Sequence, residues 1–197
     1  MWVKSAQLAV ALILTVCFAQ ENSPVELILK ADENISGPLG GQKRSSCLRV
    51  YADGKVVYAR WWNSAVAEVD KNGKESRGEQ TVSVENHLEK GDVWELSSFL
   101  ESKVLADLPS KFSPPHRAVD YFENVTVQIL NQNGEKKQIS TREFYVASLK
   151  EKAHYPSALV VLMDRIGDIE KEANEKGKPT QIPSDCQLKS WLLRVAP

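Results

Sequence analysis

The chain has 197 residues, with 25 basic and 26 acidic side chains, a formal net charge of −1 at pH 7 and 42% hydrophobic residues. This nearly balanced charge provides no basic surface for nucleic acid or for an anionic membrane, so neither is expected as a partner. The length and the apolar content suit one domain with a core of its own.

Residues 1–19 have the layout of a secretory signal peptide. One early lysine precedes an apolar run of eleven residues, Leu8–Phe18, and the small residues Cys17 and Ala19 suit cleavage after Ala19. The run is too short to cross a membrane, which takes about 20 apolar residues. Lipidation of Cys17 is the alternative, but a bulky valine precedes it where a small residue is needed. We therefore expect residues 20–197 to form a single exported domain, periplasmic or secreted, without a transmembrane span.

Cleavage would leave Cys47 and Cys186 as the only cysteines. An even pair in an exported chain predicts a disulfide, which here would tie the C-terminal tail to the body of the domain. Two buried, unpaired thiols are the alternative. Neither cysteine belongs to a Cys-x-x-Cys motif, so we expect no redox role.

The first strand is predicted over Pro24–Lys30, and a loop rich in glycine and proline follows over Asn34–Gly41. The glycine pair of this loop could cradle a phosphate only at the mouth of a helix. A strand follows instead, so we expect neither a nucleotide site nor another cofactor. Asn34 and Asn124 match the pattern for N-glycosylation, which matters only in a eukaryotic secretory pathway.

Asp53-Gly54, set between alternating apolar residues, predicts a β-hairpin over residues 46–62. In a two-residue primed turn, Tyr51 would face Val56. With Gly54 in a left-handed bulge, Val50 would face Val56 instead. We prefer the bulged form because it gathers four apolar side chains on one face: Leu48, Val50, Val56 and Tyr58.

The register of this hairpin also decides which of two adjacent tryptophans is buried, because a slip of one residue exchanges the two faces. Both tryptophans cannot point into the same core, so the sequence predicts a binding surface at this strand end, where aromatic and arginine anchors gather. The candidate binding residues are Tyr58, Arg60, Trp61 and Trp62. The alternative is that the polar loop or the C-terminal tail covers the second tryptophan.

Two amphipathic helices are predicted. The first begins near Lys90, with an N-cap close to Asp92, and ends before Leu108-Pro109, while the second begins with Pro156 as its first helical residue. Their apolar stripes comprise Val93, Leu96, Phe99, Leu100 and Val104 in the first, and Leu159, Leu162, Met163, Ile166 and Ile169 in the second. Glu170 is assigned to the opposite, polar face of the second helix.

The remaining elements are strands. A polar stretch over residues 70–79 predicts a solvated turn before a strand over residues 80–84. Asn133-Gly134 predicts a second hairpin whose strands cover residues 125–130 and 136–141, apolar on one face and covered there by helices. The tail, residues 184–194, is expected to dock on the body.

The segment 111–123 carries the densest group of chemically capable side chains, and His116, Asp120 and Glu123 could be drawn as a metal or acid–base site. The segment offers no defined ligand spacing on a regular element, so a solvated loop is the simpler interpretation. No nucleophile elbow, zinc-protease motif or phosphate-binding loop is present. The sequence therefore favours a protein without catalysis and predicts no metal site.

The order of a hairpin, a helix, a second hairpin and a closing helix resembles uncharacterised exported domains of bacteria. The matching segments are residues 50–58, 100–109, 124–138 and 156–169. The resemblance implies an exported compartment and an α+β fold, and no activity. We expect an α+β domain with a mostly antiparallel sheet of about five to six strands and two helices packed on one face. The expected function is a non-catalytic binding or cell-envelope-associated module, whose partner is a protein or a glycan. The alternative is a hydrolase or a metal-dependent enzyme that uses residues 116–123.

Overall fold

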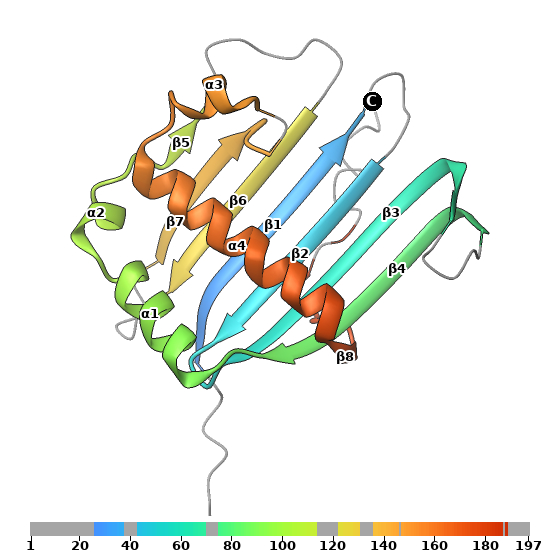
Figure 1. The fold of residues 1–197 in the computed structure, drawn as a ribbon, viewed down its shortest axis with the longest axis horizontal. Coiled ribbons are helices and arrows are strands. Elements are labelled where there is room, and N and C mark those ends of the chain that lie inside the picture. Colours follow the sequence, from blue (N-terminus) through green and yellow to red (C-terminus); the bar gives the residue numbers. More distant parts are fainter. Residues whose placement is uncertain are drawn as a thin grey trace, which may run out of the picture.

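The computed structural model describes residues 26–37, 43–69, 75–113, 122–130, 136–145, 147–186 and 188. Within these ranges, eight strands form one open sheet in the order β5-β7-β6-β1-β2-β3-β4-β8 (Figure 1). Neighbouring strands are antiparallel except β5 and β7, which run parallel. The strands are β1 (Leu27–Ser36), β2 (Lys43–Tyr51), β3 (Lys55–Val69), β4 (Glu75–His87), β5 (Lys111–Phe112), β6 (Phe122–Leu130), β7 (Lys136–Arg142) and β8 (Lys178–Pro179).

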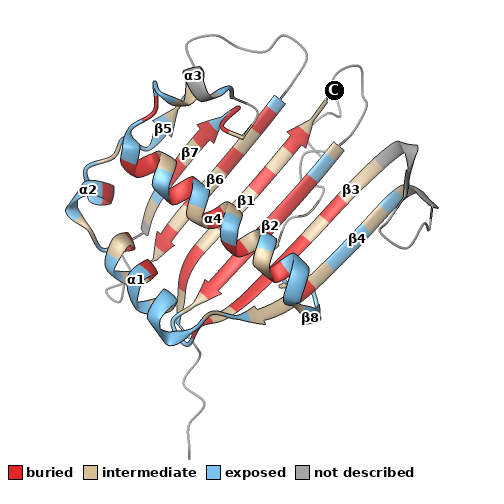
Figure 2. Cartoon of the chain, in the orientation of Figure 1, coloured by how far each residue is buried: buried red, intermediate tan, exposed pale blue. Residues whose placement is uncertain are grey.

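A long helix, α4 (Ser157–Lys176), crosses one face of this sheet diagonally (Figure 1). We call this side the helix face and the opposite side the back face. The other helices are α1 (Lys90–Leu100), α2 (Lys103–Ala106) and α3 (Leu149–Lys152). The predicted apolar stripe of α4 is buried, and buried residues run along this helix and the strands beneath it (Figure 2).

The α+β class and the helix-covered antiparallel sheet are therefore confirmed, but the sheet is larger than predicted. The two additional strands, β5 and β8, have two residues each. A segment this short cannot display the period of a strand, so its pairing depends on the neighbouring edge rather than on its own sequence. Among the described residues, no helix is both long enough and apolar enough to span a membrane.

The hairpin between β2 and β3 has the bulged register. Val50 pairs with Val56 and Leu48 pairs with Tyr58, as the apolar pattern predicts. Gly54 has a φ of +92°, and its N–H donates to Tyr51 O at 3.0 Å. A Cβ at this position would lie 2.9 Å from Leu88 O, so the turn requires glycine both for its backbone angle and for its space.

Two of the predicted loops are shorter than expected, because adjoining strands continue into them. β1 extends to Ser36, and Ile35 pairs with Arg44 on one side and with Glu123 on the other. β4 begins at Glu75, inside the stretch predicted as a turn. Pairing with β2 and β6 in the case of β1, and with β3 in the case of β4, thus overrides the weak strand preference of asparagine, glutamate and glycine. The turn motif Asn133-Gly134 and residues 70–74 lie outside the described residues.

The first predicted helix is divided into two. α1 ends at Leu100, and Ser102 caps α2 by accepting a hydrogen bond from Leu105 N at 3.4 Å. This break turns Val104 outward, so it is 61% exposed instead of continuing the apolar stripe. α1 begins at Lys90, as predicted, but its N-cap is Glu89 rather than a residue close to Asp92. α4 begins after Pro156 rather than with it.

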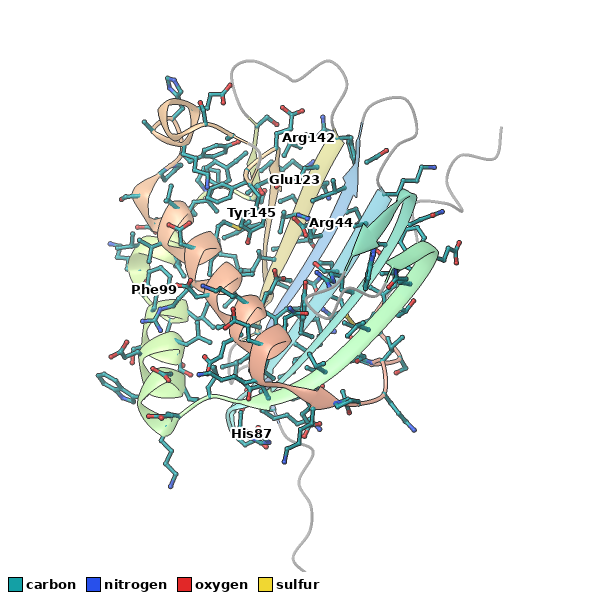
Figure 3. All side chains as sticks on the ribbon, turned by 45° about the vertical axis from the view of Figure 1, so that its right-hand side comes forward. Arg44, His87, Phe99, Glu123, Arg142 and Tyr145 are labelled. Atoms are coloured by element: carbon teal, nitrogen blue, oxygen red, sulfur yellow. A yellow bond between two sulfur atoms is a disulfide. The ribbon has the colours of Figure 1, made fainter. Side chains whose placement is uncertain are left out.

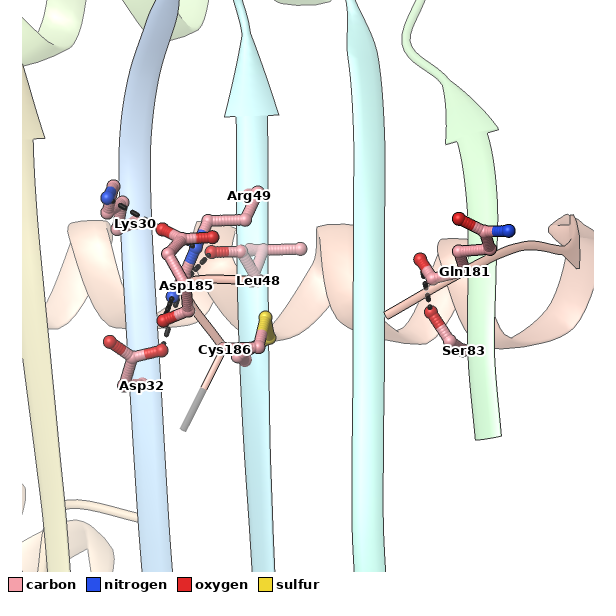
Figure 4. The surroundings of a disulfide bond; sticks show 9 residues. Lys30, Asp32, Leu48, Arg49, Ser83, Gln181, Asp185 and Cys186 are labelled. Carbon is pink, nitrogen blue, oxygen red and sulfur yellow. Dashed lines mark hydrogen bonds and ion pairs between the residues drawn. A yellow bond between two sulfur atoms is a disulfide. The ribbon is translucent and has the colours of Figure 1, made fainter. Parts of the chain in front are cut away.

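The C-terminal segment is held against the back face by a disulfide and a charged cluster (Figure 4). The predicted disulfide is present and joins Cys47 of β2 to Cys186. Next to it, Arg49 is 1% exposed and donates from Nε to Asp185 Oδ2 at 3.0 Å and from Nη1 to Asp32 Oδ1 at 2.9 Å. Partial burial acts to raise the pKa of Asp185, but a hydrogen bond from Lys30 and the charge of Arg49 hold that pKa below its usual value.

Candidate functional site

The pairing register shows how the helix face changes from apolar to polar along the strands. Residues that are paired across neighbouring strands project from the same face of the sheet. The row under α4 is apolar and consists of Ile139, Val127, Ala31, Leu48, Tyr58 and Val84. The next row consists of Thr141, Val125, Glu33, Ser46, Arg60 and Val82, and the row after it of Glu123, Ile35, Arg44, Trp62 and Gln80.

We call the polar members of these last two rows, together with Trp62, the polar end of the helix face. The polar end comprises Glu33, Arg44, Ser46, Arg60, Trp62, Gln80, Glu123 and Thr141. In Figure 3, Arg44 and Glu123 lie toward one end of the sheet with Tyr145, and His87 lies at the other end. The polar end therefore continues the sheet surface beyond the apolar core.

Glu33 is a buried carboxylate at the polar end, 7% exposed. Its Oε2 accepts a hydrogen bond from Ser46 Oγ at 3.3 Å, and its Oε1 lies 3.6 Å from Arg44 Nη2, beyond hydrogen-bond distance. Glu33 Oε1 has no hydrogen-bond partner in the described part of the chain. Burial raises the pKa of Glu33 above its usual value, although Arg44 and Ser46 act to lower it.

Arg60 and Trp62 project from β3 on the same face. The Arg60 guanidinium lies 4.4 Å from the centroid of the Trp62 ring, a cation–π arrangement. Arg60 Nε is buried and donates to no acceptor within the described ranges. Gln80, which pairs with Trp62 from β4, likewise has a buried Nε2 without a described acceptor. One unused donor therefore belongs to the residue stacked on the Trp62 ring, and the other belongs to the cross-strand partner of Trp62.

α4 contributes a second carboxylate. Burial raises the pKa of Glu170 to about 8, and the charge of Glu33 adds to this shift against the opposing charges of Arg44 and Arg60. The side chain was predicted to lie on the solvent face of the helix, but it is half-buried.

Gly177 ends the helix at a position where a Cβ would lie 2.8 Å from Val84 Cβ. This close approach to β4 holds the C-terminal half of α4 against the sheet.

Glu123 has a structural contact of its own. It is fully buried, and its Oε1 accepts a hydrogen bond from the backbone N of Tyr145 at 2.9 Å. Tyr145 in turn donates from its hydroxyl to Met163 O of α4 at 3.1 Å. Glu123 therefore anchors the turn after β7 to the sheet. His116 and Asp120 lie outside the described residues, and no group of three ligand side chains suited to a metal occurs within them.

The structure separates the four residues predicted as a binding surface. Arg60 and Trp62 belong to the polar end, and Tyr58 is buried under α4 in the adjoining row. Trp61 points to the back face and is 1% exposed, so it is a packing residue and not part of this site. Sequence reasoning missed Glu33, Arg44, Gln80 and Glu170. The sequence does carry a signal for Glu33. Once the first strand is extended to Ser36, Glu33 is a charged residue at an inward-facing position between the apolar residues Ala31 and Ile35.

Comparison with known proteins does not assign the chain to a family. No family model and no curated protein matches it. Any functional assignment therefore depends on the described side chains.

Replacing Thr141 tests how much an unpaired polar group of the polar end lowers the free energy of unfolding. Thr141 is fully buried, and its Oγ1 has no hydrogen-bond partner among the described residues. Thr141→Val keeps the shape and removes the unpaired group, so we expect the free energy of unfolding to rise by about 1 kcal/mol. Urea denaturation measures this change.

Thr126→Val is the matched control, because Thr126 is half-buried on the back face and its hydroxyl accepts a hydrogen bond from Asn124 Nδ2 at 3.4 Å. We expect this variant to gain nothing. A loss of stability in Thr141→Val would show that its hydroxyl is satisfied in the folded protein.

Proposed function

We propose that this protein is an exported, non-catalytic binding module and that its ligand occupies the polar end of the helix face. The observation that carries the proposal is the set of buried polar atoms without partners on this one surface: Glu33 Oε1, Arg60 Nε, Gln80 Nε2 and Thr141 Oγ1. Buried polar groups in proteins are nearly always hydrogen-bonded, because each unpaired one costs about 1–3 kcal/mol. A bound ligand that supplies the missing hydrogen-bond partners explains why these polar side chains are present on a buried surface.

Export is supported by two features. The chain begins with a segment that has the layout of a signal peptide, and Cys47 and Cys186 form a disulfide, which persists in oxidising compartments. We therefore place the ligand in the cell envelope or outside the cell, as a protein or a glycan that presents polar groups.

The alternative, a hydrolase or a metal-dependent enzyme using residues 116–123, has less support. Of its three candidate residues, only Glu123 lies within the described ranges, and this carboxylate is engaged with the backbone of Tyr145. Metal bound to the purified protein, together with its loss in His116→Ala, would favour the enzyme.

The proposal predicts that a partner captured by crosslinking from an envelope extract is lost in Trp62→Ala and in Arg60→Leu. Both variants remove groups from the polar end, so the captured amount should fall at least about tenfold, as for a central anchor worth more than about 1.4 kcal/mol. Quantitative mass spectrometry of the captured material gives the measurement.

Trp94→Ala is the matched control, since Trp94 of α1 is 71% exposed and does not belong to the polar end. Its capture should equal that of the wild type. Equal capture by all the variants would remove the polar end from the interface and overturn the proposal.

A further inference from the structure

The polar end and the adjoining Glu170 of α4 present two different sets of polar groups, and this division indicates the chemistry of the ligand. The acceptor set consists of Glu33 on β1 and Glu170 on α4. The donor set consists of Arg60 on β3 and Gln80 on β4, on the other side of β2. The following inference depends on the proposed function, because it specifies which ligand the polar end binds.

The acceptor set suits a positively charged donor. Glu33 Oε1 is buried without a hydrogen-bond partner in the described part of the chain, and Glu170 is near enough for its charge to interact with that of Glu33. Two carboxylates in a site poorly reached by water cannot both ionise at low cost. At pH 7 Glu170 is mostly protonated, because burial and the neighbouring Glu33 raise its pKa to about 8. An ammonium group can replace this proton and also donate to Glu33.

The donor set suits an anion. Arg60 Nε and Gln80 Nε2 are both buried and both lack an acceptor among the described residues. Arg60 stacks on the Trp62 ring, and Gln80 is the cross-strand partner of Trp62. A carboxylate accepts hydrogen bonds through two oxygens and forms its strongest bonds with a guanidinium. One carboxylate can therefore pair with both donors.

We propose that the part of the envelope ligand bound at the polar end is zwitterionic, with its ammonium group between Glu33 and Glu170 and its carboxylate on Arg60 and Gln80. The charges of the site support a ligand with both signs. Arg44, half-exposed and 3.6 Å from Glu33, is the second cation beside the two carboxylates, so a purely cationic ligand meets two guanidinium groups. A purely anionic ligand meets the carboxylate of Glu33 and leaves Glu33 Oε1 without a donor. Amino acids and their longer ω-amino homologues carry the same two groups, so they are small probes of this site.

Binding of this ligand is linked to a proton. Within the described ranges, the charged groups that interact with Glu170 are Glu33 from β1, Arg44 from β2 and Arg60 from β3. Tyr58 and Tyr145 also lie within reach of its charge, and burial raises the pKa of each hydroxyl so that both stay neutral. Because the ammonium group takes the place of the proton on Glu170, binding below about pH 8 releases that proton, and affinity increases as the pH rises toward 8.

Isothermal titration calorimetry on the full chain near pH 7 tests this inference. The probes are glycine, β-alanine and 4-aminobutanoate, each compared with its methyl ester and with its N-acetyl derivative. We expect saturable binding of at least one zwitterion, and binding at least about tenfold weaker for its two singly charged analogues, because each leaves buried charged groups unpaired. Titration in two buffers with different ionisation enthalpies should show proton release in the wild type and none in Glu170→Gln.

Two pairs of variants complete the test. Glu33→Gln and Arg60→Leu should each weaken binding at least about tenfold, whereas the controls Glu175→Gln, on the exposed side of α4, and Arg142→Leu, exposed at the end of β7, should bind like the wild type. If Arg60→Leu fails to fold by circular dichroism, Gln80→Leu tests the same donor set.

The outcomes separate this inference from the proposed function. If an ester or an N-acetyl analogue binds as tightly as its zwitterion, or if no probe binds, the proposal of a zwitterionic ligand is overturned. If no zwitterion binds while capture from the envelope extract still depends on Arg60 and Trp62, the polar end binds a ligand of another class. If a zwitterion binds equally well to wild type, Glu33→Gln and Arg60→Leu, its site lies elsewhere and the inference fails.

Discussion

Replacing Cys47 and Cys186 together by alanine is expected to lower the free energy of unfolding by about 5 kcal/mol. The bond joins residues 139 positions apart, so it closes a loop that includes most of the described chain. In the chain-entropy account, opening so long a loop frees the unfolded state and hardly alters the folded one. A domain is usually stable by only about 5–15 kcal/mol, so this loss would remove a large part of the total.

The measurement is urea denaturation of the oxidised protein, the reduced protein and the double alanine variant. Reduced protein and variant should agree, and both should show a steeper dependence on urea, because an unfolded chain without the crosslink exposes more surface. A loss below about 1 kcal/mol would contradict the loop-closure argument. It would instead show that Arg49 and Asp185 hold the C-terminal segment without help from the disulfide.

The parts of the fold that could be predicted depend on local chemistry. Asp53-Gly54 determines its hairpin because glycine can adopt the backbone angle that the bulge needs, and the apolar pattern of the flanking strands selects the register. The stripe of α4 could be predicted because five apolar side chains recur with the helical period over a long segment. The break at Ser102 was missed because a serine cap competes with helix continuation through a single hydrogen bond.

The site was harder to predict than the fold, because it is assembled by pairing between distant strands. Arg60 and Trp62 could be selected from one strand, but their neighbour Gln80 depends on the register of β3 with β4. Glu170 follows the buried Ile169 in a helix whose charged residues mostly face water. Only the diagonal path of α4 over the sheet brings Glu170 near Glu33, and the helical period contains no information about that path.

Trp61→Ala is expected to lower the free energy of unfolding by about 3–5 kcal/mol, whereas Trp62→Ala should cost about 1 kcal/mol or less. The difference arises from the alternation of side chains along β3. Trp61 is 1% exposed on the back face, and its removal leaves a cavity in packed surroundings. Trp62 is half-buried on the helix face, where water can fill the space left by the ring.

Urea denaturation of the two variants and of the exposed control Trp94→Ala measures this difference, and capture from the envelope extract gives the complementary readout. Trp61→Ala, kept below its unfolding temperature, should retain its partner, while Trp62→Ala should be stable and lose it. The two adjacent tryptophans would thereby separate stability from binding. A larger loss of stability for Trp62→Ala than for Trp61→Ala would contradict the bulged register, because a slip of one residue at Gly54 exchanges the two faces of β3.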